Sequence, residues 1–280
     1  MDYLFRGDAP FGDEVWSSID HAVIQVARDQ LIGRRFIPIF GPLGAGVDSI
    51  NMDDLEIDGD SKIDFGGEQE DIPIRIKGRK YVTIPMIYKD LLISWRDMER
   101  SKQIGFPLEL SPVAIAAAAC CHQEDDIIFN GNKKYGYPGL TTAEGRQIVE
   151  KSHWVEGENP FKDVAEGIEK LVRKGFYGPY VLVVSPDVYL QMQRIQPGTG
   201  ILELDRVKEL VGGKVYKTPV LGENKAVLLS KGSENMDLVI GQDMITAYLG
   251  PEQMNHRFRV FETLLLRIKR PEGIVTFETK

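Results

Sequence analysis

The stretch from Ser111 to Gly131 constrains the fold most strongly, because the sequence marks both ends of one long helix. Ser111 can cap the first turn and Pro112 suits the first helical position, while Asn130 and Gly131 supply the left-handed residues that end a helix. The middle is rich in alanine, which lets other backbone pack closely against it. We predict a structural helix here rather than an active site.

Composition and charge limit the classes of function. The chain has 280 residues, 42% of them hydrophobic, which is enough for a sizeable core in one large domain or two ordinary ones. Its formal net charge is −8, and no run of basic residues interrupts the acidic excess. Since neutralising a phosphate backbone needs a basic surface, we expect no nucleic-acid partner.

The cysteines and the amino-terminal region point to a compartment. The only cysteines are the neighbours Cys120 and Cys121, which a helix holds in a geometry unsuited to a disulfide. The first ten residues lack a basic start followed by an apolar run, and the longest apolar stretch, Val113 to Cys121, is too short to cross a bilayer. We therefore expect a cytoplasmic protein with no membrane partner.

The first 46 residues predict one amphipathic helix followed by an extended segment. Apolar residues recur at helical spacing from Asp13 to Leu31, and Gly33 offers a stop. Residues 34–40 look extended, with Pro38 restricting them to the edge of a sheet. The apolar stripe consists of Trp16, Ile19, Val23, Val26 and Leu31.

Residues 47–88 predict a projecting two-stranded arm. The first part is acidic with little helical periodicity, and residues 72–88 alternate apolar and polar on both sides of a predicted turn at Lys77-Gly78-Arg79. A lone two-stranded ribbon is marginal in water. The arm is therefore expected to need a partner surface, such as another copy of the chain.

The remainder mixes helices and strands. Helices are expected at 161–174, from 185 and at 202–211, with a loop at 195–200 and strands at 180–184, 226–230, 238–240 and 258–269. The fold class is α+β, and its domains share distant chain segments.

No motif supports a catalytic or metal site. The glycines of residues 41–46 lack the order of a nucleotide-binding loop, and the acidic residues 54–60 lack the glutamate that completes a calcium loop. Glu124, Asp125 and Asp126 beside His122 are interpreted as a surface-facing helix end rather than metal ligands. We expect no enzyme, no catalytic residue and no metal.

Several blocks of sequence, in the same order and spacing, resemble family 1 encapsulins, which are bacterial shell proteins with the tailed-phage capsid fold. This family was long labelled as linocin-type bacteriocins. The blocks that carry the resemblance are Ala27–Phe36 with Gly41-Pro42, Tyr88–Arg100, Gln123–Gly131, Gly139-Leu140, Gly178–Val184, Gly241–Met244 and Phe258–Arg267.

The resemblance implies a Hong Kong phage-type major capsid protein fold. It places an amino-terminal helix and arm at 1–46, an extended loop at 47–88 and an axial domain at 135–223. The peripheral domain would be split between 89–134, which holds the spine helix, and 224–280.

In this family, cargo enzymes dock terminal peptides on the inner wall of the shell. Part of the apolar helix stripe must be ordinary core, so Arg34 and Asp243 are the stronger candidates, and their charges are expected to contribute only about 1 kcal/mol or less to stability. By resemblance, the docking residues here are Val23, Val26, Ala27, Leu31, Arg34, Phe36, Asp243 and Met244.

Two further sites follow from the resemblance. Trp95 matches a position where a family shell stacks a flavin, although a buried structural tryptophan is the commoner case. No other cofactor is expected. The second site is a pore loop at the five-fold axis, where residues 195–200 would form a neutral gate with Arg194 at its edge. The site consists of Arg194, Ile195, Gln196, Pro197, Gly198, Thr199 and Gly200.

The function implied is a self-assembling icosahedral nanocompartment that encloses cargo, for iron storage or for defence against oxidative stress. The expected cargo is a ferritin-like protein or a dye-decolourising peroxidase, and iron storage is favoured. The alternatives are a prophage major capsid protein that encloses DNA and, more distantly, a secreted bacteriocin or protease. The acidic net charge and the matching cargo blocks favour the compartment.

Overall fold

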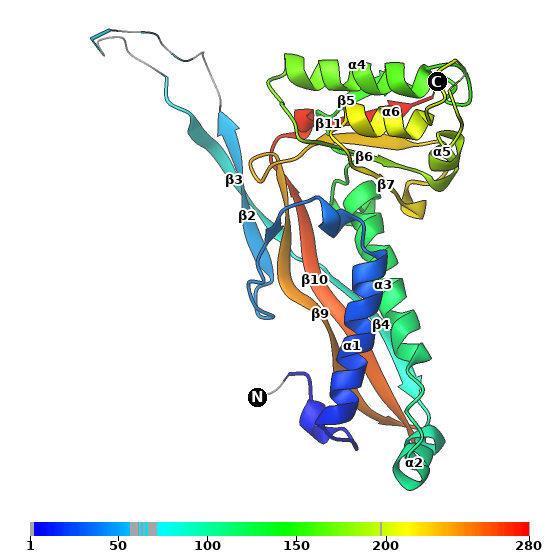
Figure 1. Cartoon of the computed structure of the whole chain (residues 1–280). Helices are drawn as coiled ribbons and strands as arrows, with labels where there is room; N and C mark the ends of the chain where they lie inside the picture. The colour runs from blue at the N-terminus through cyan, green and yellow to red at the C-terminus, as the bar shows by residue number, and fades with distance from the viewer. Residues whose placement is uncertain are drawn as a thin grey trace.

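The computed structural model describes residues 3–56, 61, 63, 65–66, 72–196 and 198–279. Figure 1 shows an elongated body built on one sheet, a head built on a second sheet at its upper end, and a two-stranded arm that projects to one side. Helices and strands alternate irregularly in both parts, so the predicted α+β class is confirmed. None of the described helices is long and apolar enough to cross a membrane.

The body contains a four-stranded sheet with the strand order β1-β9-β10-β4. Its long antiparallel hairpin pairs with β4 on one side and with the short parallel strand β1 on the other. The predicted strands at 238–240 and 258–269 are therefore parts of longer strands. The bounds are β1 (Ile39–Phe40), β4 (Met86–Ile93), β9 (Met236–Glu252) and β10 (Asn255–Ile268).

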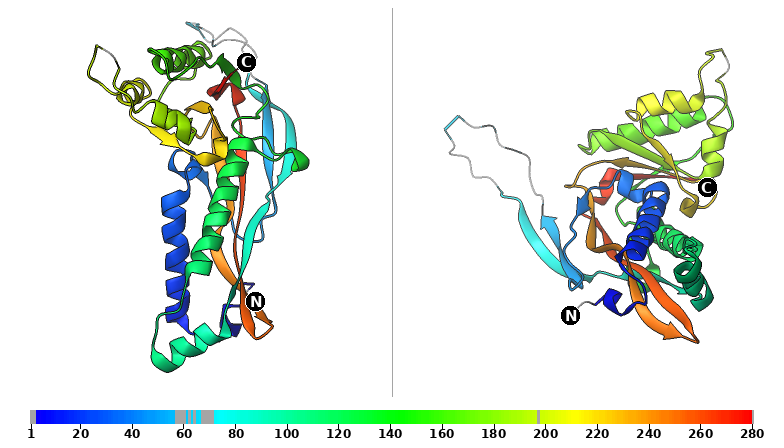
Figure 2. Two further views of the ribbon diagram at one scale, coloured as in Figure 1. Left: turned by 90° about the vertical axis from the view of Figure 1, so that its right-hand side faces the viewer. Right: turned by 60° about the horizontal axis from the view of Figure 1, so that its bottom comes forward.

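Two long helices, α1 (Asp13–Gln30) and α3 (Ser111–Asn130), lie side by side along this sheet (Figure 2). The small side chains of Ala116 and Ala117 on α3 are fully buried and allow this close approach. Ile19 of α1 and Phe258 of β10, both with no exposed surface, belong to the same hydrophobic core. The predicted spine helix is thus the central element of the body core.

The ends of α3 agree with the prediction in one of two details. Gly131 ends the helix with a φ of 69°, and a Cβ there would collide with the backbone of Tyr137, so only glycine fits. Ser111 does not cap the helix as expected, because it is already the first helical residue and its hydroxyl donates to Glu109 Oε1. The short helix α2 (Trp95–Ile104), capped by Ser94, precedes α3.

The head contains a five-stranded sheet, ordered β5-β11-β8-β6-β7, with its own core. Its elements are β5 (Gln147–Glu150), α4 (Asn159–Arg173), β6 (Tyr180–Val184), α5 (Pro186–Gln191), α6 (Glu203–Leu210), β7 (Val215–Lys217), β8 (Ala226–Ser230) and β11 (Ile274–Glu278).

The boundary expected at 223/224 does not separate the two sheets. Strands β8 and β11 come from the segment assigned to the second part of the peripheral domain, yet both lie inside the head sheet. Strand β8 is buried at every position and β11 at every position but the last. Such apolar strands need cover on both faces, which they obtain inside the head sheet.

The arm is two-stranded as predicted, but its register differs. Strand β2 (Ser49–Glu56) pairs antiparallel with β3 (Arg75–Thr83), so Gly78 lies inside a continuous strand and the turn predicted there is wrong. Cross-strand ion pairs stabilise the acidic strand β2, with 2.6 Å between Asp53 Oδ1 and Arg79 Nε. Most of residues 57–71 lie outside the described part of the chain.

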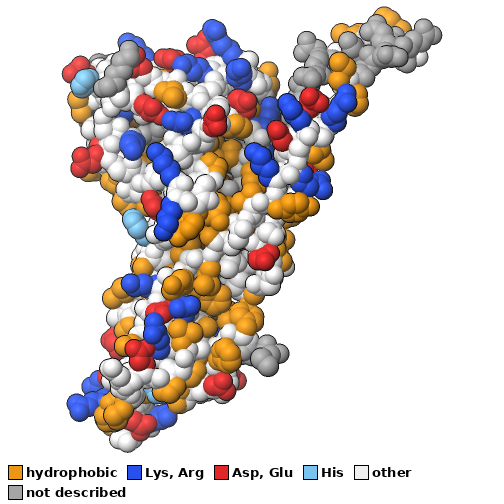
Figure 3. All heavy atoms as spheres, turned by 180° about the vertical axis from the view of Figure 1, so that it is seen from behind, with side chains coloured by type: hydrophobic (Ala, Val, Ile, Leu, Met, Phe, Trp, Pro, Cys, Tyr) orange, Lys and Arg blue, Asp and Glu red, His pale blue; other side chains and the backbone are white. Residues whose placement is uncertain are grey.

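Within the described residues, the arm packs on the body at its base. Ile50 and Val82 lie against a small cluster around Val239 and Leu265. Farther out, the exposed fraction is 65% for Ile74, 50% for Ile76 and 75% for Tyr81. Seen from behind in Figure 3, hydrophobic side chains also gather along the elongated body and on the arm.

We expect the arm to be needed for assembly but not for folding of the subunit. Replacing residues 51–81 with Asn-Gly, a tight hairpin turn, joins the paired residues Ile50 and Val82 without disturbing the body core. Circular dichroism should show unchanged helix content, and size-exclusion chromatography should show loss of closed particles. Intact particles from this variant would contradict the assembly role of the arm.

Candidate functional site

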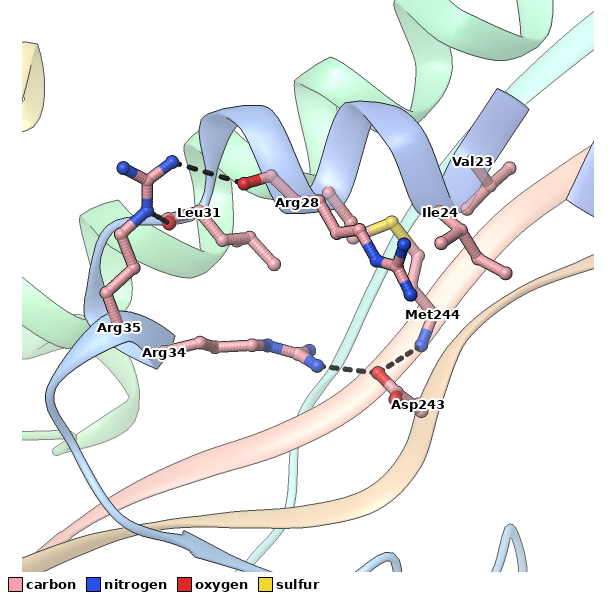
Figure 4. A pocket seen from close by; sticks show the side chains of 9 residues that line it. Val23, Ile24, Arg28, Leu31, Arg34, Arg35, Asp243 and Met244 are labelled. Carbon is pink, nitrogen blue, oxygen red and sulfur yellow. Dashed lines mark hydrogen bonds and ion pairs between the residues drawn. The ribbon is translucent and has the colours of Figure 1, made fainter. Parts of the chain in front are cut away.

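A groove of about 360 Å³ lies between the end of α1 and strand β9 (Figure 4). Six of the eight residues predicted for peptide docking line it, together with Ile24, Arg28 and Arg35, which the sequence analysis did not select. The complete lining is Val23, Ile24, Ala27, Arg28, Leu31, Arg34, Arg35, Asp243 and Met244.

Helical spacing explains the α1 side of the groove. Val23, Ala27 and Leu31 follow one another at intervals of four residues and share one face, on which Val23 and Leu31 are buried. Ile24 and Arg28 lie one position further round, at the edge of this stripe. Ile24 is 45% exposed, so an apolar surface faces solvent here. The sequence signal that could have identified Ile24 is an apolar residue placed next to the stripe rather than within it.

A β-bulge explains the opposite side. Gln242 pairs with Thr263 and Ile245 with Phe261, so Asp243 and Met244 together face the single residue Glu262. A bulge of this kind redirects the side chains on the longer strand. It allows Asp243 and Met244, which are neighbours in sequence, both to reach the groove.

Val26 and Phe36 do not line the groove. Val26 packs against the body core, and Phe36 is 5% exposed, with its ring stacked on Tyr216 and tilted against Phe129. Both are apolar residues next to groove residues in sequence, and they turn inward because the body core lies on that side.

Arg34 is the centre of an ion-pair cluster beneath the groove. Its Nε lies 2.8 Å from Glu124 Oε1, its Nη2 lies 2.6 Å from Glu262 Oε2, and its Nη1 lies 2.6 Å from Asp243 Oδ1. The Glu124 and Glu262 side chains have no exposed surface, whereas that of Asp243 is 63% exposed. The interpretation of Glu124 and Asp125 as a surface-facing helix end is therefore wrong, because α1 and its following turn cover them.

Because this cluster is buried, Arg34 contributes more to stability than the sequence analysis expected. Burial by itself lowers the pKa of Arg34, but the hydrogen bonds that Arg34 donates to Glu124 and the charges of Glu124 and Glu262 outweigh this effect and raise the pKa above its ordinary value. Removing Arg34 would leave two buried carboxylates without a cation, and breaking such a pair costs about 3–5 kcal/mol. Arg34 is thus a structural residue, whatever else it contacts.

Asp125 fixes the turn that follows α1. Its carboxylate accepts hydrogen bonds from the backbone N–H groups of Ile32, at 3.1 Å, and Gly33, at 2.9 Å. Residues Gly33–Arg35 form a short 3₁₀ helix, so the segment predicted to be extended from residue 34 becomes a strand only at Ile39. A Cβ at Gly33 would lie 2.6 Å from Ile128 Cδ1, which explains the glycine.

The predicted pore loop connects α5 and α6. Arg194 donates from Nη2 to Gly157 O, at 2.8 Å, and Gln196 is buried, with its backbone N–H bonded to Ile201 O. Ile195, Gly198, Thr199 and Gly200 are exposed. Pro197 lies outside the described residues.

Trp95 lies at the start of α2, away from the groove. Its side chain is half-buried, and the Arg96 guanidinium lies 5.4 Å from the ring centroid. Within the described residues, no group of three or more His, Cys, Asp or Glu side chains could hold a metal ion.

Comparison with known proteins assigns this chain to one family. A family described as "Encapsulating protein for peroxidase" matches residues 1–265. The type 1 encapsulin shell protein EncA of Myxococcus xanthus is 44% identical over 99% of this chain and 96% of its own length. The chain belongs to the type 1 encapsulins. Like other encapsulins, it is a shell protein that self-assembles into particles and not an enzyme, and needs no cofactor for that role.

Further relatives of this encapsulin include fusion proteins and solved particles. A diheme-cytochrome-encapsulin shell fusion protein of Kuenenia stuttgartiensis is 42% identical over 95% of this chain and 73% of its own length. The virus-like particle of Pyrococcus furiosus matches with a TM-score of 0.77 at 21% identity, covering 95% of this chain and 100% of that chain. The capsid of Myoviridae phage XM1 matches with a TM-score of 0.63 at 12% identity, over 87% and 90%. These structural matches show the predicted Hong Kong phage-type capsid fold.

We expect Asp125 to make the fold less stable as the pH rises. Burial raises the pKa of Asp125 from its ordinary 3.8 to about 6, despite the hydrogen bonds from Gly33 and Ile32. Because the pKa is higher in the folded than in the unfolded state, the stability that the protonated Asp125 contributes is fully present below about pH 4. This contribution is lost as the pH rises through about 6, which lowers the free energy of unfolding by about 3 kcal/mol per subunit. Asp125→Asn removes this loss.

Thermal unfolding of wild-type and Asp125→Asn particles between about pH 4 and 7 tests this expectation. The stability of the variant relative to wild type should increase with pH. Asp97→Asn, which removes an exposed ion pair on α2, provides the control and should show no such increase. A constant difference between Asp125→Asn and wild type would contradict the account.

Proposed function

We propose that this encapsulin encloses a cargo enzyme and holds it on the inner wall of the shell through a peptide that docks in the groove between α1 and β9. The observation that supports this most directly is the groove itself. It combines a solvent-facing apolar edge at Ile24 and Met244 with an accessible carboxylate at Asp243. A short peptide can bury apolar side chains on such a surface while polar groups fix its register.

The cargo we propose is a ferritin-like protein or a peroxidase, and iron storage is the favoured role, with defence against oxidative stress as the other. Support comes from the wording of the family description, "Encapsulating protein for peroxidase". A ferritin-like-encapsulin shell fusion protein of Pyrococcus furiosus, 24% identical over 73% of this chain and 55% of its own length, also supports it. The proposed location of the particle is the cytoplasm.

The remaining predicted sites are proposals of the same kind. The exposed residues of the loop at 195–200 would line a neutral pore, and Trp95 would be the contact for a flavin if one binds. A DNA-filled prophage capsid shares the fold, but the capsid structures are only 10–15% identical to this chain. The net charge of −8 also favours a protein cargo over DNA.

The groove can be tested by packaging. The cargo is first identified by mass spectrometry of isolated particles, and its terminal peptide is then fused to a fluorescent protein. Ile24→Asp should reduce the packaged fluorescence per particle at least tenfold, because it places a charge on the apolar edge, and Asp243→Ala should reduce it several-fold. Arg34 is left unchanged, since its loss would affect folding.

Val172→Asp is the matched control. It replaces an exposed apolar residue on α4, in the head, and should leave packaging unchanged. All variants are compared at equal yield of closed particles. Full packaging by Ile24→Asp would show that the docking surface lies elsewhere.

A further inference from the structure

Two buried carboxylates beneath the groove share one donor nitrogen. Arg34 Nη2 lies 2.8 Å from Glu124 Oε2 and 2.6 Å from Glu262 Oε2, so these two oxygens converge on the same point. Both carboxylates are fully buried. The other oxygen of Glu262, Oε1, has no hydrogen-bond partner among the described residues.

The charges of this cluster do not balance. One guanidinium contacts three carboxylates, and a buried carboxylate that lacks its own cation costs several kcal/mol. The repulsion between two buried carboxylates that converge on one nitrogen is relieved when one of them binds a proton. Burial raises the pKa of Glu262 well above its ordinary value, and the charge of Glu124 raises it further.

Other titratable and charged groups lie around the cluster or line the groove above it. They do not supply a second cation in contact with Glu262, because the ion pairs of Glu262 and Glu124 within the described residues are with Arg34. These surrounding groups are Lys89 on β4, Arg28 on α1, Arg35 after α1, and Cys120, Cys121 and Asp125 on α3.

Asp243 connects this cluster to the groove. Its Oδ1 accepts hydrogen bonds from Arg34 Nη1, at 2.6 Å, and from the backbone N–H of Met244, at 2.9 Å. Of the three carboxylates, only Asp243 is accessible to water. If both buried carboxylates carry a charge, Arg34 is drawn toward them, and Asp243 is the partner that water can replace.

We propose that Glu262 holds a proton and shares it with Glu124 by donating a hydrogen bond to that carboxylate, and that loss of this proton releases Asp243 from Arg34 and loosens the β9 side of the groove. Occupancy of the groove would then fall as the pH rises. This last consequence rests on the docking role proposed above, whereas the shared proton and its effect on β9 do not.

Glu262→Gln isolates the neutral form, because an amide keeps an oxygen acceptor for Arg34 and cannot ionise. Difference infrared spectra of wild-type minus Glu262→Gln particles at about pH 7 should show the C=O stretch of a protonated carboxylic acid. Asp125→Asn, which also removes a carboxyl from this region, is the matched control and should keep the band. A wild-type spectrum without the band would overturn the proposal.

Hydrogen exchange measured by mass spectrometry tests the effect on β9. After correction for intrinsic exchange, the segment 242–246 should lose protection by at least tenfold in wild type as the pH rises and Glu262 loses its proton, and less than twofold in Glu262→Gln over the same pH range. Equal loss in both proteins would overturn the coupling to Asp243.

Binding of the labelled cargo peptide separates this proposal from the docking role. Its affinity for wild-type particles should fall by up to tenfold per pH unit above the pH at which Glu262 loses its proton, and stay within twofold for Glu262→Gln. Absence of binding at every pH would overturn the docking role, while the infrared and exchange results would still decide the proton-sharing pair.

Discussion

One guanidinium joins segments that lie far apart in the chain. Arg34 follows the amino-terminal helix, and its partners lie on the spine helix and on both strands of the long hairpin. Because two of these partners are fully buried, α1 cannot leave its place without exposing or unpairing them, at a cost of several kcal/mol. Asp125 adds backbone hydrogen bonds to the same turn. The position of α1, and with it the groove, depends on this contact.

The sequence predicts the elements whose signals are local. The spine helix is marked by Pro112 and Gly131, and the stripe of α1 by regular helical spacing, so both are found close to their expected limits. Six groove residues were also identified, through resemblance rather than through spacing. What local patterns cannot show is which side of a helix another segment will cover. Glu124 and Asp125 looked solvent-facing for this reason.

Pairing partners are the other feature that the sequence leaves undetermined. Gly78 resembles a turn residue, but its strand continues because β2 lies alongside it, and the acidic residues of β2 find their cations only across the ladder. The bulge at Asp243 and Met244 depends on the register between β9 and β10, which a single strand does not encode. Likewise, the sequence predicts β8 as a strand and misses β11, and the place of both inside the head sheet follows from long-range pairing.

The central claim is that this subunit builds a closed shell whose groove faces inward and holds cargo. Electron cryo-microscopy of particles isolated with their contents tests it most directly. The account predicts hollow icosahedral particles with the α1–β9 groove on the inner surface and additional peptide density over Ile24 and Met244. A groove on the outer surface, or particles filled with DNA, would contradict it.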